Sequence, residues 1–207
     1  MSIFDDIKFW VHQTMEHAEY LATLLIDKRL VQISREFEAN FKNNSLARLP
    51  DWKSFIQMLM NQQKQGYFIG YALPSLLQHF LDEHNILILA IQAQDSVASS
   101  HNNRDSNAIQ KYNNFIVRYA GQHHAEEVQV LSKLTDPLLN VQTSIDKFIT
   151  EFNNNQELEQ FLYLSQELRK FQKDVFNTHL TILHPRLLHH IDREIEWFSS
   201  KLNPLLS

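Results

Sequence analysis

The 207-residue chain contains no cysteine. Disulfide bonds and thiolate chemistry are therefore excluded, and any metal site must be built from histidine, aspartate or glutamate. Glycine and proline are also scarce, at 3 and 5 residues, which leaves few of the turns that a β-sandwich or a β-barrel requires. Leucine, glutamine, glutamate and lysine are frequent instead, and this composition favours long helices in an all-α fold.

Long hydrophobic runs and blocks of basic residues are missing as well. No stretch of about 18 consecutive apolar residues occurs, so we expect no spanning helix and no membrane partner. The net charge of -5 is spread over interleaved acids and bases, so we expect no nucleic-acid partner. Asp5 and Asp6 stand where a signal peptide needs basic residues, which predicts a cytoplasmic location. The oligomeric state stays open, with a homo-oligomer as one alternative.

The sequence is a succession of helical patterns in which apolar residues recur three or four positions apart. In the first half, these patterns and the loop residues between them predict helices at about residues 3–26, 27–42, 51–73 and 74–97. In the second half, they predict helices at about residues 107–134, 136–152, 157–183 and 185–201. Asp51 is the predicted N-cap of the third helix.

The two halves repeat one set of residues in the same order. The triplet Glu-His-Ala around His17 corresponds to His-His-Ala around His124, 107 positions later. A proline, two leucines, His79 and Glu83 recur in order 111 positions later. We interpret this parallel as the internal duplication of a four-helix unit. It predicts two repeats that form one compact domain, at residues 1–98 and 107–207, with a linker at residues 99–106.

The residues of the repeat point to metal binding. In both halves a histidine precedes a glutamate by four residues, which on a helix places both side chains on one face. His17 and His124 lie on the apolar stripes of their helices, where a polar group is costly unless it is paired. If several helices point such groups into the interior, then a bound metal ion would supply the positive charge that balances them. The predicted ligands are His17, His79, Glu83, His124, His190 and Glu194.

Other polar residues near these positions have different predicted roles. Glu16 and His123 are predicted either as alternative ligands or as residues that contact the ligands. His12 is expected to pair with Glu16 on the solvent side of the helix. His84 falls on an apolar stripe and corresponds to Ile195 in the second half, which predicts a core or ligand-contacting histidine.

Four imidazoles with two carboxylates suit a transition metal, with iron preferred over manganese or zinc, whereas calcium and magnesium prefer oxygen ligands. The leading hypothesis is a metal-binding protein, of which a di-iron protein is one form. The alternative is a non-enzymatic helical interaction or scaffold protein with buried His-Glu hydrogen-bond networks. A zinc hydrolase with Glu16 as the base is a third interpretation. The sequence leaves open whether the chain is an enzyme.

One family shares the motifs Phe9-Trp10 and Glu16-His17-Ala18, followed by Pro74 with Leu77, His79 and Glu83. On these residues, the chain resembles the bacterial family called domain of unknown function 2935 over nearly its whole length. Members of this family are duplicated, ferritin-like helical proteins. The resemblance implies a ferritin-like central bundle with flanking helices, about eight in all, and a metal site between the repeats.

The resemblance implies that the metal site includes Glu16, His17, His79 and Glu83 in the first half. In the second half it implies His124, His190 and Glu194. Two positions depart from the family pattern. The glutamate before His-Ala is His123 here, and the Phe-Trp pair is Ile116-Val117. The His-Glu spacing of four also differs from the spacing of three in ferritins. It is similar to that of hemerythrins, whose di-iron centre binds dioxygen, so redox or dioxygen chemistry is one expectation.

Overall fold

A computed structural model describes residues 2–99, 108–116, 119 and 185–202 of the chain. These residues form helices and connections, with one isolated β-bridge and no strand among them, so the all-α prediction is confirmed for this part. The chain divides into two compact units, Met1–Phe115 and Ile116–Ser207. The helices predicted at residues 136–152 and 157–183, most of the predicted linker, and hence the count of eight helices lie outside the described residues.

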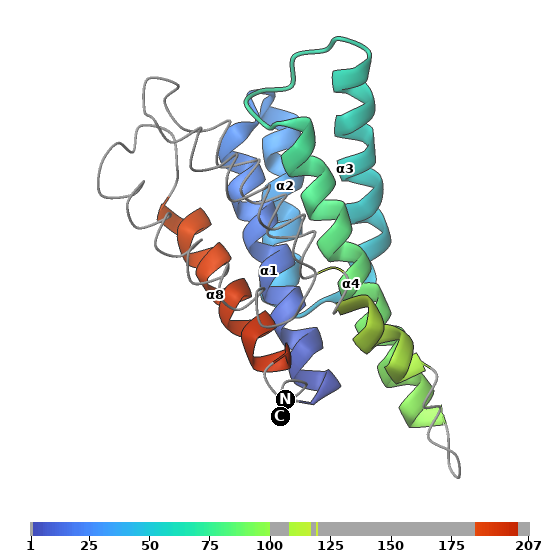
Figure 1. Cartoon of the computed structure of the whole chain (residues 1–207). Helices are drawn as coiled ribbons and strands as arrows, with labels where there is room; N and C mark the ends of the chain where they lie inside the picture. Colours follow the sequence, from blue (N-terminus) through green and yellow to red (C-terminus); the bar gives the residue numbers. More distant parts are fainter. Residues whose placement is uncertain (1, 100–107, 117–118, 120–184, 203–207) are drawn as a thin grey trace, which may run out of the picture. The chain divides into compact units, whose positions relative to one another are not determined.

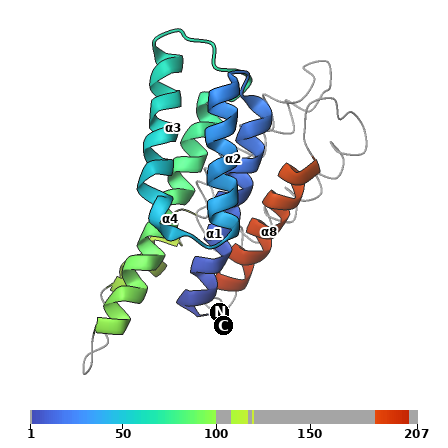
Figure 2. The ribbon, with the colours of Figure 1, turned by 180° about the vertical axis from the view of Figure 1, so that it is seen from behind.

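The first unit is a bundle of four long helices (Figures 1 and 2). In order, its elements are α1 (Ile3–Leu24), α2 (Lys28–Lys42), the short 3-10 helix η1 (Leu46–Arg48), α3 (Leu49–Lys64) and α4 (Pro74–Ser99). Helix α1 packs against α2 and α4, and α3 packs against α4. The buried Ser34 hydroxyl donates a hydrogen bond of 2.8 Å to the Ala18 carbonyl and so joins α2 to α1.

The starts of α1 and α2 have the caps that their sequences favour. Ser2 and Asp5 form a capping box, in which the Ser2 hydroxyl accepts the Asp5 N–H and the Asp5 carboxylate accepts the Ser2 N–H. The Asp27 carboxylate accepts the backbone N–H groups of Arg29 and Leu30, at 2.7 and 3.2 Å. Because this cap starts a new helix, α1 and α2 are separate, as predicted.

The third helix differs from its prediction at both ends. Helix α3 begins at Leu49, because Pro50 fits the first helical turn, where no N–H is needed. The predicted cap, Asp51, therefore lies inside the helix, paired at 2.7 Å with Arg48. The helix ends at Lys64 instead of about residue 73, because Gly66 adopts a left-handed φ of 86°.

The connection between α3 and α4 is anchored to the end of α1. Leu25 and Gly70 form an antiparallel β-bridge. The Ile26 N–H donates to the Ile69 carbonyl at 3.1 Å, and the Tyr71 N–H donates to the Leu24 carbonyl at 2.8 Å. Gly70 has a φ of 137°, and a Cβ atom there would lie 2.1 Å from the Leu24 carbonyl oxygen. Only glycine fits this position without a backbone shift.

An aromatic cluster forms much of the core between α2, α3 and α4. Its centre is Trp52, which is fully buried, with ring centroids 5.3 Å from Phe37 and 6.4 Å from Phe80. Phe41 and Phe55 extend the cluster along α2 and α3. Aromatic side chains bury large apolar areas, so this cluster stabilises the packing that positions α4.

The second unit contains α8 (Pro185–Leu202), which agrees with the helix predicted at residues 185–201. Both α4 and α8 begin at a proline, and such a residue suits a first helical turn. Residues 108–116 and 119 are helical, in agreement with the start of the helix predicted at residues 107–134. None of the described helices combines the length and the apolar composition that a membrane crossing requires.

Candidate metal centre

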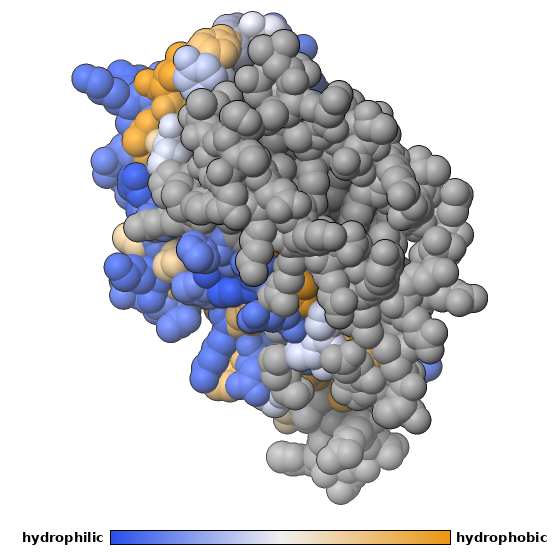
Figure 3. Space-filling view, turned by 60° about the vertical axis from the view of Figure 1, so that its left-hand side comes forward, coloured by the Kyte–Doolittle hydropathy of each residue, from blue (hydrophilic) through white to orange (hydrophobic). Residues whose placement is uncertain are grey.

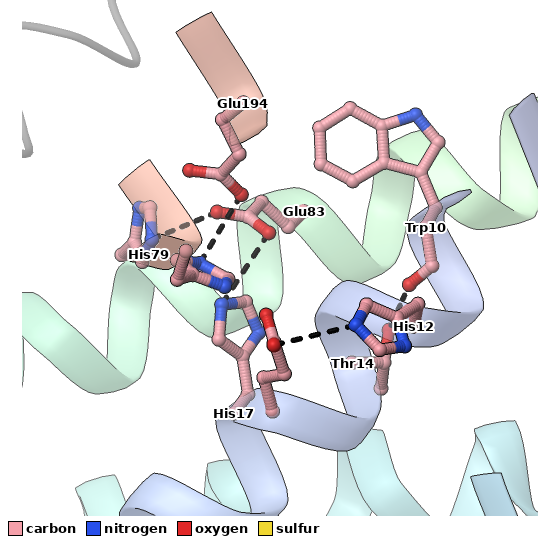
Figure 4. A network of polar contacts seen from close by, with 9 residues as sticks. Trp10, His12, Thr14, His17, His79, Glu83 and Glu194 are labelled. Carbon is pink, nitrogen blue, oxygen red and sulfur yellow. Dashed lines mark hydrogen bonds and ion pairs between the residues drawn. The ribbon is translucent and has the colours of Figure 1, made fainter. Parts of the chain in front are cut away.

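Three predicted ligands of the first unit converge on one point (Figure 4). His17 comes from α1, and His79 and Glu83 come from α4. The Nε2 atom of His79 lies 2.7 Å from Glu83 Oε1, and the Nε2 atom of His17 lies 3.4 Å from Glu83 Oε2. The three residues offer ligand atoms within 4.8 Å of one another. The Glu83 carboxylate therefore lies between two imidazole nitrogens.

The helices hold these side chains in place. His79 and Glu83 are four residues apart, so they share the face of α4 that is turned toward α1. The His17 ring stacks on Phe80, with 4.1 Å between centroids and 24° between planes. Because Phe80 belongs to the aromatic core around Trp52, the orientation of the His17 ring is tied to the packing of three helices.

The group is almost completely removed from water. The side chains of His17, His79 and Glu83 are 3%, 4% and 1% exposed. An ionised carboxylate at such a site is costly unless a positive charge and hydrogen bonds compensate for the lost hydration. That compensation has two chemical sources, a protonated imidazole or a bound cation.

The distances are compatible with metal coordination. Nitrogen and carboxylate ligands of iron or zinc lie about 2.0–2.2 Å from the ion, which separates neighbouring ligand atoms by about 3.0–3.4 Å. The pair formed by His17 and Glu83, at 3.4 Å, already has this separation. The pair formed by His79 and Glu83, at 2.7 Å, would have to open by a few tenths of an ångström. The donor set and its geometry therefore fit a transition metal.

The second unit contains a matching pair on α8. The Nε2 atom of His190 lies 3.1 Å from Glu194 Oε1, and both side chains are buried. The same two kinds of atom, Nε2 and Oε1, form the pair of His79 and Glu83. The pattern of burial also repeats 111 positions later. Residues 189–199 are buried or exposed to the same degree as residues 78–88, except that Leu81 and its counterpart Asp192 differ. The sequence parallel thus corresponds to a shared helical face.

The other predicted residues take different places. Glu16 contacts His12, with 3.3 Å between Oε1 and Nε2, and the His12 side chain is 52% exposed, which confirms the predicted surface pair. His84 is buried, as predicted for a core histidine. Burial, with a contribution from Lys53, lowers the pKa of His84 to about 4. His123 and His124 lie outside the described residues.

One buried polar pair was not predicted. The Tyr112 hydroxyl donates a hydrogen bond of 3.1 Å to Asp6 Oδ2, and both residues are at most 1% exposed. Burial and the neighbouring Asp6 charge raise the pKa of Tyr112 above its usual range. Asp6 lies 4 and 11 residues before Trp10 and His17, on the same helical face, so the periodicity of α1 contained a signal for its burial.

Comparison of the chain with protein-family models, with curated proteins and with solved structures finds no match. The resemblance to the family called domain of unknown function 2935 therefore stays a prediction. The evidence for a function is the geometry of His17 with His79 and Glu83, and that of the pair formed by His190 and Glu194.

Proposed function

We propose that the chain is a metal-binding protein and that His17, His79 and Glu83 hold a transition-metal ion. The observation that carries this proposal is the burial of one carboxylate between two imidazole Nε2 atoms, with ligand atoms within 4.8 Å of one another. Nitrogen and carboxylate ligands suit iron, manganese or zinc, and we prefer iron. A bound redox metal would supply electron-transfer or dioxygen chemistry.

The second repeat is proposed to complete the ligand set. His190 and Glu194 repeat the atoms and the burial of His79 and Glu83 within their own unit, which supports an equivalent role. His124 corresponds in sequence to His17 and is the proposed counterpart. A ferritin-like bundle of two duplicated halves, with one or two ions, is the arrangement that this proposal implies.

The protein groups have distinct roles in this proposal. Glu83 supplies negative charge and orients both imidazoles through its two oxygens. Phe80 holds the His17 ring, and the aromatic core beyond it excludes water from that side. Because imidazole binds a metal ion in its neutral form, metal binding should release any proton that a histidine of this site holds.

A second function is favoured by one distance. The 2.7 Å separation of His79 Nε2 and Glu83 Oε1 is short enough for a direct ion pair between a protonated imidazole and the carboxylate. If a protonated imidazole balances Glu83, then the cluster is a structural network and the chain is a helical interaction or scaffold protein.

Elemental analysis and metal titration of the purified chain separate these functions. We expect bound transition metal in the wild type and its loss in His79→Ala. His12→Ala is the matched control, because His12 also precedes a glutamate by four residues but is largely exposed. Metal at about 100 times its Kd should add about 2.7 kcal/mol to the unfolding free energy, or roughly 5–10 °C in Tm. A metal-free chain with the same Tm in metal and in chelator would favour the structural network.

A further inference from the structure

The connection between α3 and α4 exposes a cluster of large side chains. Tyr67, Phe68 and Tyr71 are 64%, 68% and 70% exposed, the highest values among large hydrophobic side chains in the described residues. Ile26, 53% exposed, lies beside them because its N–H is bonded to the Ile69 carbonyl. We call Ile26, Tyr67, Phe68 and Tyr71 the aromatic tip. Figure 1 places this connection at the upper end of the first unit, where Figure 3 shows hydrophobic surface.

The aromatic tip is held in place by backbone contacts. The bridge between Leu25 and Gly70 ties the connection to the end of α1, directly beside the exposed side chains. The rings of Phe68 and Tyr71 also meet edge to face, with centroids 6.0 Å apart. The tip is therefore presented by a defined turn, and its apolar area is exposed to water at a free-energy cost.

Basic residues flank the tip. Lys28, Arg29 and Lys64 are exposed, and none of them forms an ion pair with another residue in the described part of the chain. Asp27 is the one acidic residue within residues 23–30 and 61–73, and its carboxylate accepts the backbone N–H groups that start α2. Three basic residues and one acidic residue give this end a charge of +2, in a chain of net charge -5.

We propose that the aromatic tip is a peripheral binding site for a membrane surface that carries anionic phospholipids. Aromatic side chains partition into the headgroup region of a bilayer, and adjacent lysine and arginine residues are attracted to anionic headgroups. A stable protein interface uses roughly 20–30 residues on each side, far more than the tip offers, which favours a bilayer over a protein partner. The expectation of no membrane partner came from the missing apolar run, and a peripheral contact needs none. This proposal does not depend on the metal centre.

Sedimentation of the full chain with vesicles tests the proposal. We expect binding to phosphatidylcholine vesicles that contain about one third phosphatidylserine, and loss of binding at about 0.5 M salt. Lys64→Ala should weaken the binding about fivefold, whereas Lys42→Ala, an exposed lysine at the other end of α2, should not. Phe68→Ser should abolish most binding. Its control is Phe4→Ser, because Phe4 is 52% exposed in the first turn of α1.

Circular dichroism should show that Phe68→Ser is folded, since the side chain is largely exposed. Three outcomes would overturn the proposal. The first is no sedimentation with either vesicle, and the second is equal binding to vesicles of phosphatidylcholine alone. The third is self-association in solution that Phe68→Ser removes, because the tip would then join copies of this chain.

Discussion

The Nε2 atom of His79 and the Oε1 atom of Glu83, one helical turn apart on α4, lie 2.7 Å from each other in the interior of the first unit. The second Glu83 oxygen faces His17 at 3.4 Å. Glu83 is thus the only one of the three residues that contacts both others through an ion pair in the described structure, and its charge decides what the cluster can bind.

Glu83→Gln should lower transition-metal affinity at least tenfold, because it removes the charge and keeps the shape. Loss of a group that merely supports a metal ligand already costs roughly 10–100-fold in affinity. Isothermal titration calorimetry of the metal-free chain measures the change.

The matched variant is Glu194→Gln, which alters the equivalent residue of α8. If the two helices serve one ion, then both variants should weaken the same binding event. If they serve separate ions, then each variant should remove one equivalent. Unchanged affinity in Glu83→Gln would contradict the proposed ligand role.

Tyr112→Phe should destabilise the chain by about 1.5–3 kcal/mol, because the buried Asp6 carboxylate loses a hydrogen-bond donor. Urea denaturation measures the difference. Tyr67→Phe is the control, since its side chain is 64% exposed, and should change stability by less than about 0.5 kcal/mol. If the contact is energetically important, then Asp6→Asn with Tyr112→Phe should cost less than the sum of the two single changes. If the losses of stability in the two single variants add up to that of the double variant, then the contact contributes little to stability.

Stability should decrease at high pH because of Tyr20. Burial raises the pKa of Tyr20 from 10.0 to about 12, so the folded chain binds the phenolic proton more tightly than the unfolded chain does. The resulting stabilisation is fully present below pH 10 and is lost as the pH rises toward 12. Phenolate absorbance should show late ionisation of Tyr20 and Tyr112, and Tyr20→Phe should remove the part with a midpoint near pH 12 while that of Tyr112 remains. An unchanged late amplitude in Tyr20→Phe would contradict the raised pKa of Tyr20.

The two left-handed glycines of the α3–α4 connection should differ sharply in their tolerance of alanine. Gly66→Ala should cost about 1–2 kcal/mol, since a Cβ atom there meets nothing within 4 Å and adds only backbone strain. Gly70→Ala should cost about 3 kcal/mol or more, because its Cβ atom would also collide with the Leu24 carbonyl. Urea unfolding of both variants checks this order, and equal losses would be inconsistent with the bridge.

Helical periodicity predicted α1, α2, α4 and α8 closely, because each has a buried apolar face that is visible in sequence. It failed for the end of α3, where the pattern continued but Gly66 and Gly70 adopted conformations that a contact with α1 requires. That contact is tertiary, so no local pattern could reveal it.

The sequence also predicted only part of the candidate site. The spacing of four residues placed His79 and Glu83 on one face, and the structure confirms their contact. The apolar stripe predicted that His17 is buried, but its stacking on Phe80 depends on how α1 meets α4. The pair formed by Tyr112 and Asp6 was missed because it joins residues 106 positions apart without a repeated motif.

The bridge between Leu25 and Gly70 fixes how far α1 is shifted along its axis relative to α4. His17 lies eight residues before Leu25, about 12 Å along the helix axis, and His79 lies nine residues after Gly70. A main-chain contact outside the cluster, the bridge between Leu25 and Gly70, thus fixes the alignment of the two helices that carry the ligands. A change in the length of the segment between Gly70 and Pro74 would displace the imidazoles from each other without altering a single side chain of the cluster.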